Sequence, residues 1–86
     1  MSEQAWRGSV IDQPHTFRLD GVEPLLAFTL RVGRFGSYRV VARGSNALDA
    51  AEVIKVNPDR VMVTGELLAD GRINATAIGL RLDFEG

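Results

Sequence analysis

Residues 27–44, Ala27-Phe-Thr-Leu-Arg-Val-Gly-Arg-Phe-Gly-Ser-Tyr-Arg-Val-Val-Ala-Arg-Gly44, decide the fold of this chain. Two segments of alternating side chains flank the short connection Gly33–Gly36. Successive side chains of a strand point to opposite faces of a sheet, so the pattern predicts a hairpin with one apolar face. In both segments the even-numbered residues form that inner face. The arginines at odd positions (Arg31, Arg39 and Arg43) form a cationic outer face.

Outside this hairpin, similar alternation and turn residues predict a mostly β chain. The predicted strands are Trp6–Ile11, with a continuation at Phe17–Leu19 beyond the Asp12–Pro14 turn, then Leu25–Val32, Ser37–Arg43, Arg60–Leu68 and Arg72–Phe84. Asp20-Gly21 and Ala69-Asp-Gly71 are predicted turns. The predicted core aromatic residues are Phe17, Phe28 and Phe84, with Trp6 pointing inward and Tyr38 in the core or at its rim.

One helix is predicted over Ala47–Val56, between the third and fourth strands. Ser45-Asn46 supplies a cap, and Asn57-Pro58-Asp59 ends the helix. Its apolar stripe comprises Ala47, Ala50, Ala51 and Ile54. In the last strand the apolar parity changes between Ala77 and Ile78, which predicts a bulge or bend near Gly79.

Three strands, a helix and two further strands make up the order of an OB-fold, a small five-stranded barrel. An SH3-like barrel has a similar number of strands but lacks this helix, and a small α+β sandwich is a second alternative. The element order favours the OB-fold over both.

Composition bounds the function. The 86 residues make one domain, which buries only about 60% of its unfolded surface and leaves little room for a deep catalytic cleft. The chain has no cysteine, no apolar run of membrane-spanning length and no signal-peptide pattern, so we expect a cytoplasmic protein without a membrane partner.

The net charge is −1, but residues 5–43 carry a net +3 and residues 49–86 a net −3. This asymmetry creates a local positive field or reflects ordinary solvated charges.

Segments spread from Trp6 to Leu82 carry a family resemblance. They are Gly8-x-Val10 with Pro14 and Arg18, Phe28-Thr-Leu-Arg-Val32, Tyr38-Arg-Val-Val-Ala-Arg-Gly44, Ala51-Glu-Val53, Arg60-Val-x-Val-x-Gly-x-Leu67, and Ile73-x-Ala75-x-x-Ile78. In order and spacing they resemble bacterial single-stranded-DNA-binding proteins and the related primosomal replication protein. The resemblance implies an OB barrel that binds single-stranded DNA in DNA replication or repair. It also implies a homodimer or homotetramer, with possible protein partners in replication or recombination.

The chain also departs from that family. The long loop between the second and third strands is reduced to Gly33–Gly36, and the loop between the last two strands to Ala69–Gly71. Ser37 and Arg43 stand where the family often has aromatic residues that stack on bases. Asp83-Phe-Glu-Gly86 is a poor match to the family's acidic tail, so recruitment of many partners is not expected.

Seven residues are the candidate nucleic-acid contacts: Arg7, Arg18, Arg31, Arg34, Phe35, Arg39 and Arg43. Guanidinium groups bind phosphates bidentately and stack on bases, which suits a single strand. Phe35, at the hairpin tip, either stacks on a base or folds back on the barrel rim. Arg7 and Arg18 extend the positive track or pair with Asp12 or Glu23.

Catalysis is not predicted. His15 is the only histidine and is predicted to lie at the surface, and the carboxylates show no spacing typical of a metal or acid–base site. No cofactor is expected. The residues favour sequence-tolerant single-stranded DNA binding. They leave open RNA binding, because no pattern reports recognition of the 2′-hydroxyl, and a barrel that docks a protein partner instead.

Overall fold

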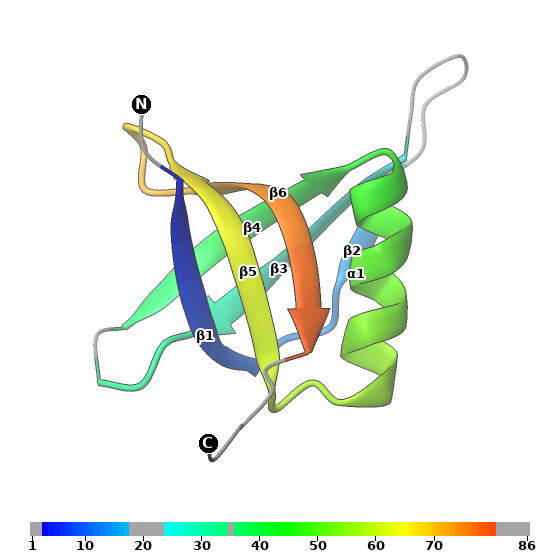
Figure 1. Cartoon of the computed structure of the whole chain (residues 1–86), viewed down its shortest axis with the longest axis horizontal. Coiled ribbons are helices and arrows are strands. Elements are labelled where there is room, and N and C mark those ends of the chain that lie inside the picture. Colours follow the sequence, from blue (N-terminus) through cyan, green and yellow to red (C-terminus); the bar gives the residue numbers. More distant parts are fainter. Residues whose placement is uncertain (1–2, 18–23, 35, 81–86) are drawn as a thin grey trace.

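The computed structural model describes residues 3–17, 24–34 and 36–80 (Figure 1). Its strands are β1 (Gln4–Val10), β2 (His15–Phe17), β3 (Leu25–Arg31), β4 (Ser37–Arg43), β5 (Val61–Leu67) and β6 (Ile73–Leu80), and its helix is α1 (Ser45–Val56). Every predicted strand is present. The part of the last strand predicted beyond Leu80, with Phe84, and the Asp20-Gly21 turn lie outside the described residues.

The sheet closes on itself as a barrel. Its strand order is β1-β5-β6-β4-β3-β2, and β1 also pairs with β3, which joins the two ends. All neighbouring strands are antiparallel except β4 and β6, which run parallel with Val40 opposite Ile73. This closed, mostly β barrel with one helix is an OB-like fold, which confirms the predicted fold class. The helix and the closure exclude the SH3-like and sandwich alternatives.

β1 and β2 together form the first strand of that barrel. Ser9 pairs with Arg31 and His15 pairs with Ala27, so both strands lie along β3. Four residues, 11–14, lie opposite only two residues of β3, and the extra length forms a kink containing Pro14. With β1 and β2 counted as one strand, α1 lies between the third and fourth strands, as predicted. Counted separately, α1 follows the fourth. The continuation begins at His15 rather than at Phe17.

The core lies between the inner face of the barrel and α1. The even-numbered residues of β3 and β4 are buried, apart from the partly buried Tyr38, which confirms the predicted inner face of the hairpin. The largest fully buried side chains are Phe28, Leu30, Val40, Val61, Val63 and Ile73. The helix packs against β3, β4 and β6. It adds Ala47, Ala50 and Ile54 to the core cluster.

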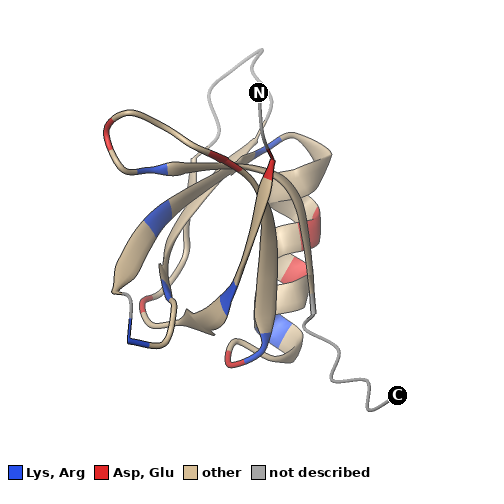
Figure 2. Ribbon diagram, turned by 60° about the vertical axis from the view of Figure 1, so that its left-hand side comes forward, with Lys and Arg blue, Asp and Glu red and all other residues tan. Residues whose placement is uncertain are grey.

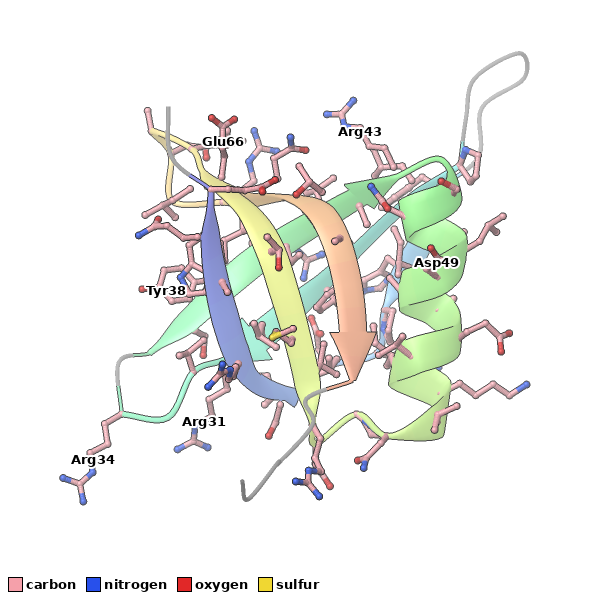
Figure 3. All side chains as sticks on the ribbon, in the orientation of Figure 1. Arg31, Arg34, Tyr38, Arg43, Asp49 and Glu66 are labelled. Carbon is pink, nitrogen blue, oxygen red and sulfur yellow. The ribbon has the colours of Figure 1, made fainter. Side chains whose placement is uncertain are left out.

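Two aromatic residues, Trp6 and Tyr38, pack against the core cluster. Tyr38 lies on the side of the molecule away from α1 (Figure 3). Its ring centroid is 6.2 Å from that of Trp6, and both residues are partly buried against the core cluster. The prediction that Trp6 and Tyr38 belong to the core or its rim is therefore confirmed.

Some local predictions are wrong. Phe17 is 52% exposed, because its strand faces solvent beside β3. Ala51 is also exposed, since the buried stripe of α1 is narrower than predicted. The helix begins at Ser45 after Gly44, which has a positive φ of 61° and gives no side-chain cap.

The bulge lies at Thr76 rather than at Gly79. Thr64 pairs with Ala77 and Gly65 pairs with Ala75, so Thr76 is the extra residue in β6. A Cβ on Gly65 would lie 2.1 Å from the carbonyl oxygen of Asn74, so glycine permits the close approach of the two strands beside the bulge.

Across the described ranges of the chain, no helix has the length and apolar character that would suit a membrane crossing.

Candidate nucleic-acid interface

The arginines of the described residues differ in whether they have a partner. Arg39 pairs with Asp12, and Arg72 pairs with Asp70. By contrast, the exposed side chains of Arg7, Arg31, Arg34 and Arg43 have no ion pair or side-chain hydrogen bond in the described part of the chain. An unpaired guanidinium retains its full charge and its donors for a ligand. Among the described residues of the predicted site, these four arginines are therefore the cations available to a ligand.

Three of them share one open cleft. Arg7 of β1, Arg31 of β3 and Arg34 of the β3–β4 connection line a hollow of about 730 Å³, together with Asp59 and backbone at Gly8 and Gly33. We call this hollow the arginine cleft. Arg31 and Arg34 project from the same corner of the molecule in Figure 3. Figure 2 shows basic positions on the strands and at the hairpin, and both acidic and basic positions on α1.

Two glycines build the arginine cleft. A Cβ on Gly8 would lie 2.0 Å from the carbonyl oxygen of Arg31, so only glycine lets β1 approach β3 at this point. That approach places Arg7 and Arg31 on the same hollow. Gly33 has a φ of 50°, in the left-handed region that favours glycine, and turns the chain so that Arg34 projects at the tip.

Arg43 lies at the other end of the outer face. Arg31 is paired with Ser37, and Arg43 follows six residues later along β4, about 20 Å away at the usual rise of a strand. In Figure 3 Arg43 is far from Arg31 and Arg34. Within the described ranges, the unpaired arginines of the predicted site therefore form two separate groups rather than one continuous track.

Arg39 lies between these groups but is engaged within the protein. Its Nη1 atom is 3.0 Å from Asp12 Oδ2 and 3.1 Å from Thr29 Oγ1. Thr29 donates its backbone N–H to Asp12 Oδ1 at 2.8 Å and its hydroxyl to Asp12 Oδ2 at 2.9 Å. Asp12 belongs to the kink between β1 and β2, where neither strand has a residue paired with Thr29. The carboxylate of Asp12 therefore accepts the Thr29 N–H in place of a backbone carbonyl. The middle of the outer face is therefore a neutral ion pair.

The same contacts set the ionisation of Asp12. Burial raises its pKa, but hydrogen bonds from Thr29 and the charge and hydrogen bond of Arg39 outweigh burial, so the pKa falls below its usual 3.8. The carboxylate stays ionised at neutral pH and holds Arg39 in place.

Two rings that the sequence did not assign to the site lie on this face. The ring centroids of His15 and Phe17 are 6.5 Å apart, and both side chains are exposed. Phe17 pairs with Leu25, which pairs with Arg43, so directly opposed side chains place Phe17 and Arg43 in one row of the outer face. The rings therefore lie near an unpaired arginine. His15 is at the surface, as predicted.

The signal that would have found them is parity. His15 and Phe17 alternate with Thr16, and their β3 partners are odd-numbered residues of the outer face. Using that signal requires the register across the kink, which the sequence does not give. Of the predicted contacts, Arg18 and Phe35 lie outside the described residues.

In the described ranges, the His, Asp and Glu side chains form no group of three or more that would hold a metal ion. Comparison with known proteins adds no family to this geometry. No protein-family model matches the chain, and no curated protein matches it closely enough to be called a relative.

Proposed function

We propose that this protein is a non-catalytic, single-stranded DNA-binding protein with little sequence preference. The observation that carries the proposal is the arginine cleft, in which three unpaired guanidinium groups share one hollow with a single carboxylate. Guanidinium groups bind phosphate oxygens bidentately, and this contact does not depend on the base.

The exposed rings support a single strand rather than a duplex. Bases of a single strand are free to stack on aromatic side chains, and each such contact contributes about 1–3 kcal/mol. His15 and Phe17 offer two rings on the same face as Arg43. We propose that phosphates bind at the arginine cleft and at Arg43, while bases stack on the two rings, which lie toward the Arg43 end of the outer face. Arg39 then orders Asp12 and Thr29 rather than contacting phosphate.

Titration of a fluorescently labelled oligo-dT over a range of salt concentrations tests the proposal. Affinity should fall linearly in log[salt], with a slope of about 0.7 for each phosphate contact to a single strand. The variant Arg7→Ala/Arg34→Ala should bind more weakly and lose about 1.4 from that slope. Arg72→Ala is the matched control, because Arg72 is exposed but paired with Asp70 at a distant hairpin.

A parallel titration with oligo-U separates DNA from RNA. Tighter binding of oligo-U would assign the protein to RNA. If neither oligonucleotide binds at low salt, the proposal is wrong and a barrel that docks a protein partner takes its place.

Assembly into a homodimer or homotetramer, with a place in replication or recombination, is a further part of the proposal. Sedimentation velocity at several protein concentrations tests the assembly, and a monomer at all concentrations would contradict it.

A further inference from the structure

We infer that the arginine cleft receives the terminal phosphate of a single strand, a phosphomonoester, in preference to an internal phosphodiester. This inference rests on the proposed function and narrows the ligand of one part of the site. It concerns Arg7, Arg31 and Arg34, and leaves the role of Arg43 and the two rings as described above.

The charge of the arginine cleft matches a phosphomonoester. Three guanidinium groups and the carboxylate of Asp59 line the hollow, which gives a net charge of +2. A phosphodiester carries a single negative charge, whereas a phosphomonoester carries about −1.5 to −2 at pH 7 and has three acceptor oxygens. A phosphodiester offers two charged oxygens to these three groups, whereas a terminal phosphate offers three. The three guanidinium groups provide a donor group for each oxygen of a terminal phosphate.

The lining of the hollow also favours phosphate without a base. Among the described residues, its apolar contributors are Ile11 and Val32, and no aromatic side chain lines it. The rings of His15 and Phe17 lie instead on the outer face beyond the kink. A strand that places its end in the arginine cleft can direct its bases toward those rings.

Asp59 opposes passage of a strand through the arginine cleft. The Pro58 carbonyl accepts the Val10 N–H at 2.8 Å, and the Asp59 carbonyl accepts the Ser9 hydroxyl at 3.4 Å, so this loop is held against β1. These bonds hold Asp59, which lines the hollow, beside β1. A strand continuing in that direction would bring its next phosphate toward a carboxylate, whereas a strand that ends in the cleft avoids the repulsion.

Three oligo-dT molecules of equal length test the inference: one with a 5′-phosphate, one with a 3′-phosphate and one with neither. Each is titrated as an unlabelled competitor against an internally labelled oligo-dT at fixed salt. We expect one of the phosphorylated molecules to bind about tenfold more tightly than the unmodified one, which corresponds to about 1.4 kcal/mol. Which of the two binds more tightly gives the direction of the strand.

Variants connect the preference to the cleft. In Arg34→Ala the preference for the phosphorylated end should fall to about twofold or less. Arg43→Ala is the control, because its guanidinium lies about 20 Å from Arg31 at the rise of a strand. This control should weaken binding of all three molecules equally and keep the preference.

Two results would overturn the inference. One is equal binding of the three molecules to the unmodified protein, which leaves single-stranded DNA binding intact. The other is a preference that persists undiminished in Arg34→Ala, because the added charge would then act through the general field of the protein. Failure of all three molecules to bind at low salt would instead remove the proposed function itself. Melting temperatures of both variants confirm that the fold is retained.

Discussion

Replacing Asp12 with alanine removes the acceptor for three hydrogen bonds at the centre of the outer face. Two come from Thr29, at 2.8 and 2.9 Å, and one comes from Arg39 at 3.0 Å. Hydrogen bonds to charged groups contribute about 1.5–3 kcal/mol each. Water replaces part of this contribution, because the side chain of Asp12 is 33% exposed. We therefore expect Asp12→Ala to lower the free energy of unfolding by about 2–3 kcal/mol, which is no more than the smallest contribution expected from the two Thr29 hydrogen bonds together.

Arg39→Ala should lower the free energy of unfolding by much less than Asp12→Ala. It removes an ion pair whose partners are 40% and 33% exposed, and exposed pairs contribute about 0.2–1 kcal/mol. Because Thr29 keeps its acceptor in this variant, the kink between β1 and β2 stays attached to β3. Thermal unfolding followed by circular dichroism measures both variants. For a domain of this size 1 kcal/mol corresponds to about 4–8 °C, so the losses in Tm are about 8–24 °C for Asp12→Ala and at most about 8 °C for Arg39→Ala.

The pH dependence has a defined sign. Folding lowers the pKa of Asp12, so its ionised form stabilises the fold at every pH above the unfolded value of 3.8. That stabilisation is lost as the pH falls below 3.8 through the folded pKa. The difference in Tm between the unmodified protein and Asp12→Ala should therefore be constant near neutrality and shrink in acid. Equal losses in the two variants, or a loss below about 1 kcal/mol for Asp12→Ala, would refute the role assigned to Asp12.

Three other predictions concern the strands that form the site. Gly8→Ala should lower the free energy of unfolding in urea by about 2–3 kcal/mol, because the added Cβ would lie 2.0 Å from a β3 carbonyl oxygen. In the control Gly79→Ala the added Cβ has no neighbouring atom within 4 Å, so the free energy of unfolding should change by less than about 0.5 kcal/mol. Similar losses in the two variants would contradict the close approach of β1 to β3. Arg39→Ala should weaken oligo-dT binding at low salt, because it exposes the negative charge of Asp12. The double variant Asp12→Asn/Arg39→Ala should restore that binding. If the double variant binds as weakly as the single one, Arg39 contacts phosphate. Phe17→Ala should keep Tm within about 4 °C of the unmodified protein, since the ring is 52% exposed. The same variant should weaken oligo-dT binding by about 1–3 kcal/mol, and unchanged binding would exclude stacking on Phe17.

The hairpin was predictable from sequence because its information is local. Phe28 and Val40 pair across a connection of a few residues, so alternation alone fixes which side chains point inward. The helix and the order of the strands follow from similar local patterns. The bulge was not placed correctly, because Thr76 and Ala77 are both small and exposed and the parity gives no position between Ala75 and Ile78.

Most of the candidate site depends on non-local contacts. The sequence identified Arg7, Arg31 and Arg34 as cations, but only the approach of β1 to β3 brings them to one hollow. It placed Phe17 in the core, and it did not anticipate the ion pair between Arg39 and Asp12. Both features depend on the register across the kink, where two extra residues turn Asp12 toward Thr29. The pairing of a charged side chain is invisible to composition and spacing alone.

The double pairing of β1 also has a consequence for the order of events in folding. Residues up to Gly8 pair with β5, whose Val61 is synthesised about fifty residues later, whereas β3 and β4 are joined by a short turn. A hairpin of that kind forms in about 1–10 μs. At about 5–20 residues per second, the ribosome needs about 3–10 s to supply the partner of β1. During synthesis the arginine-bearing hairpin can therefore form before the barrel closes, because closure also needs β6, the last strand made, to pair with both β4 and β5.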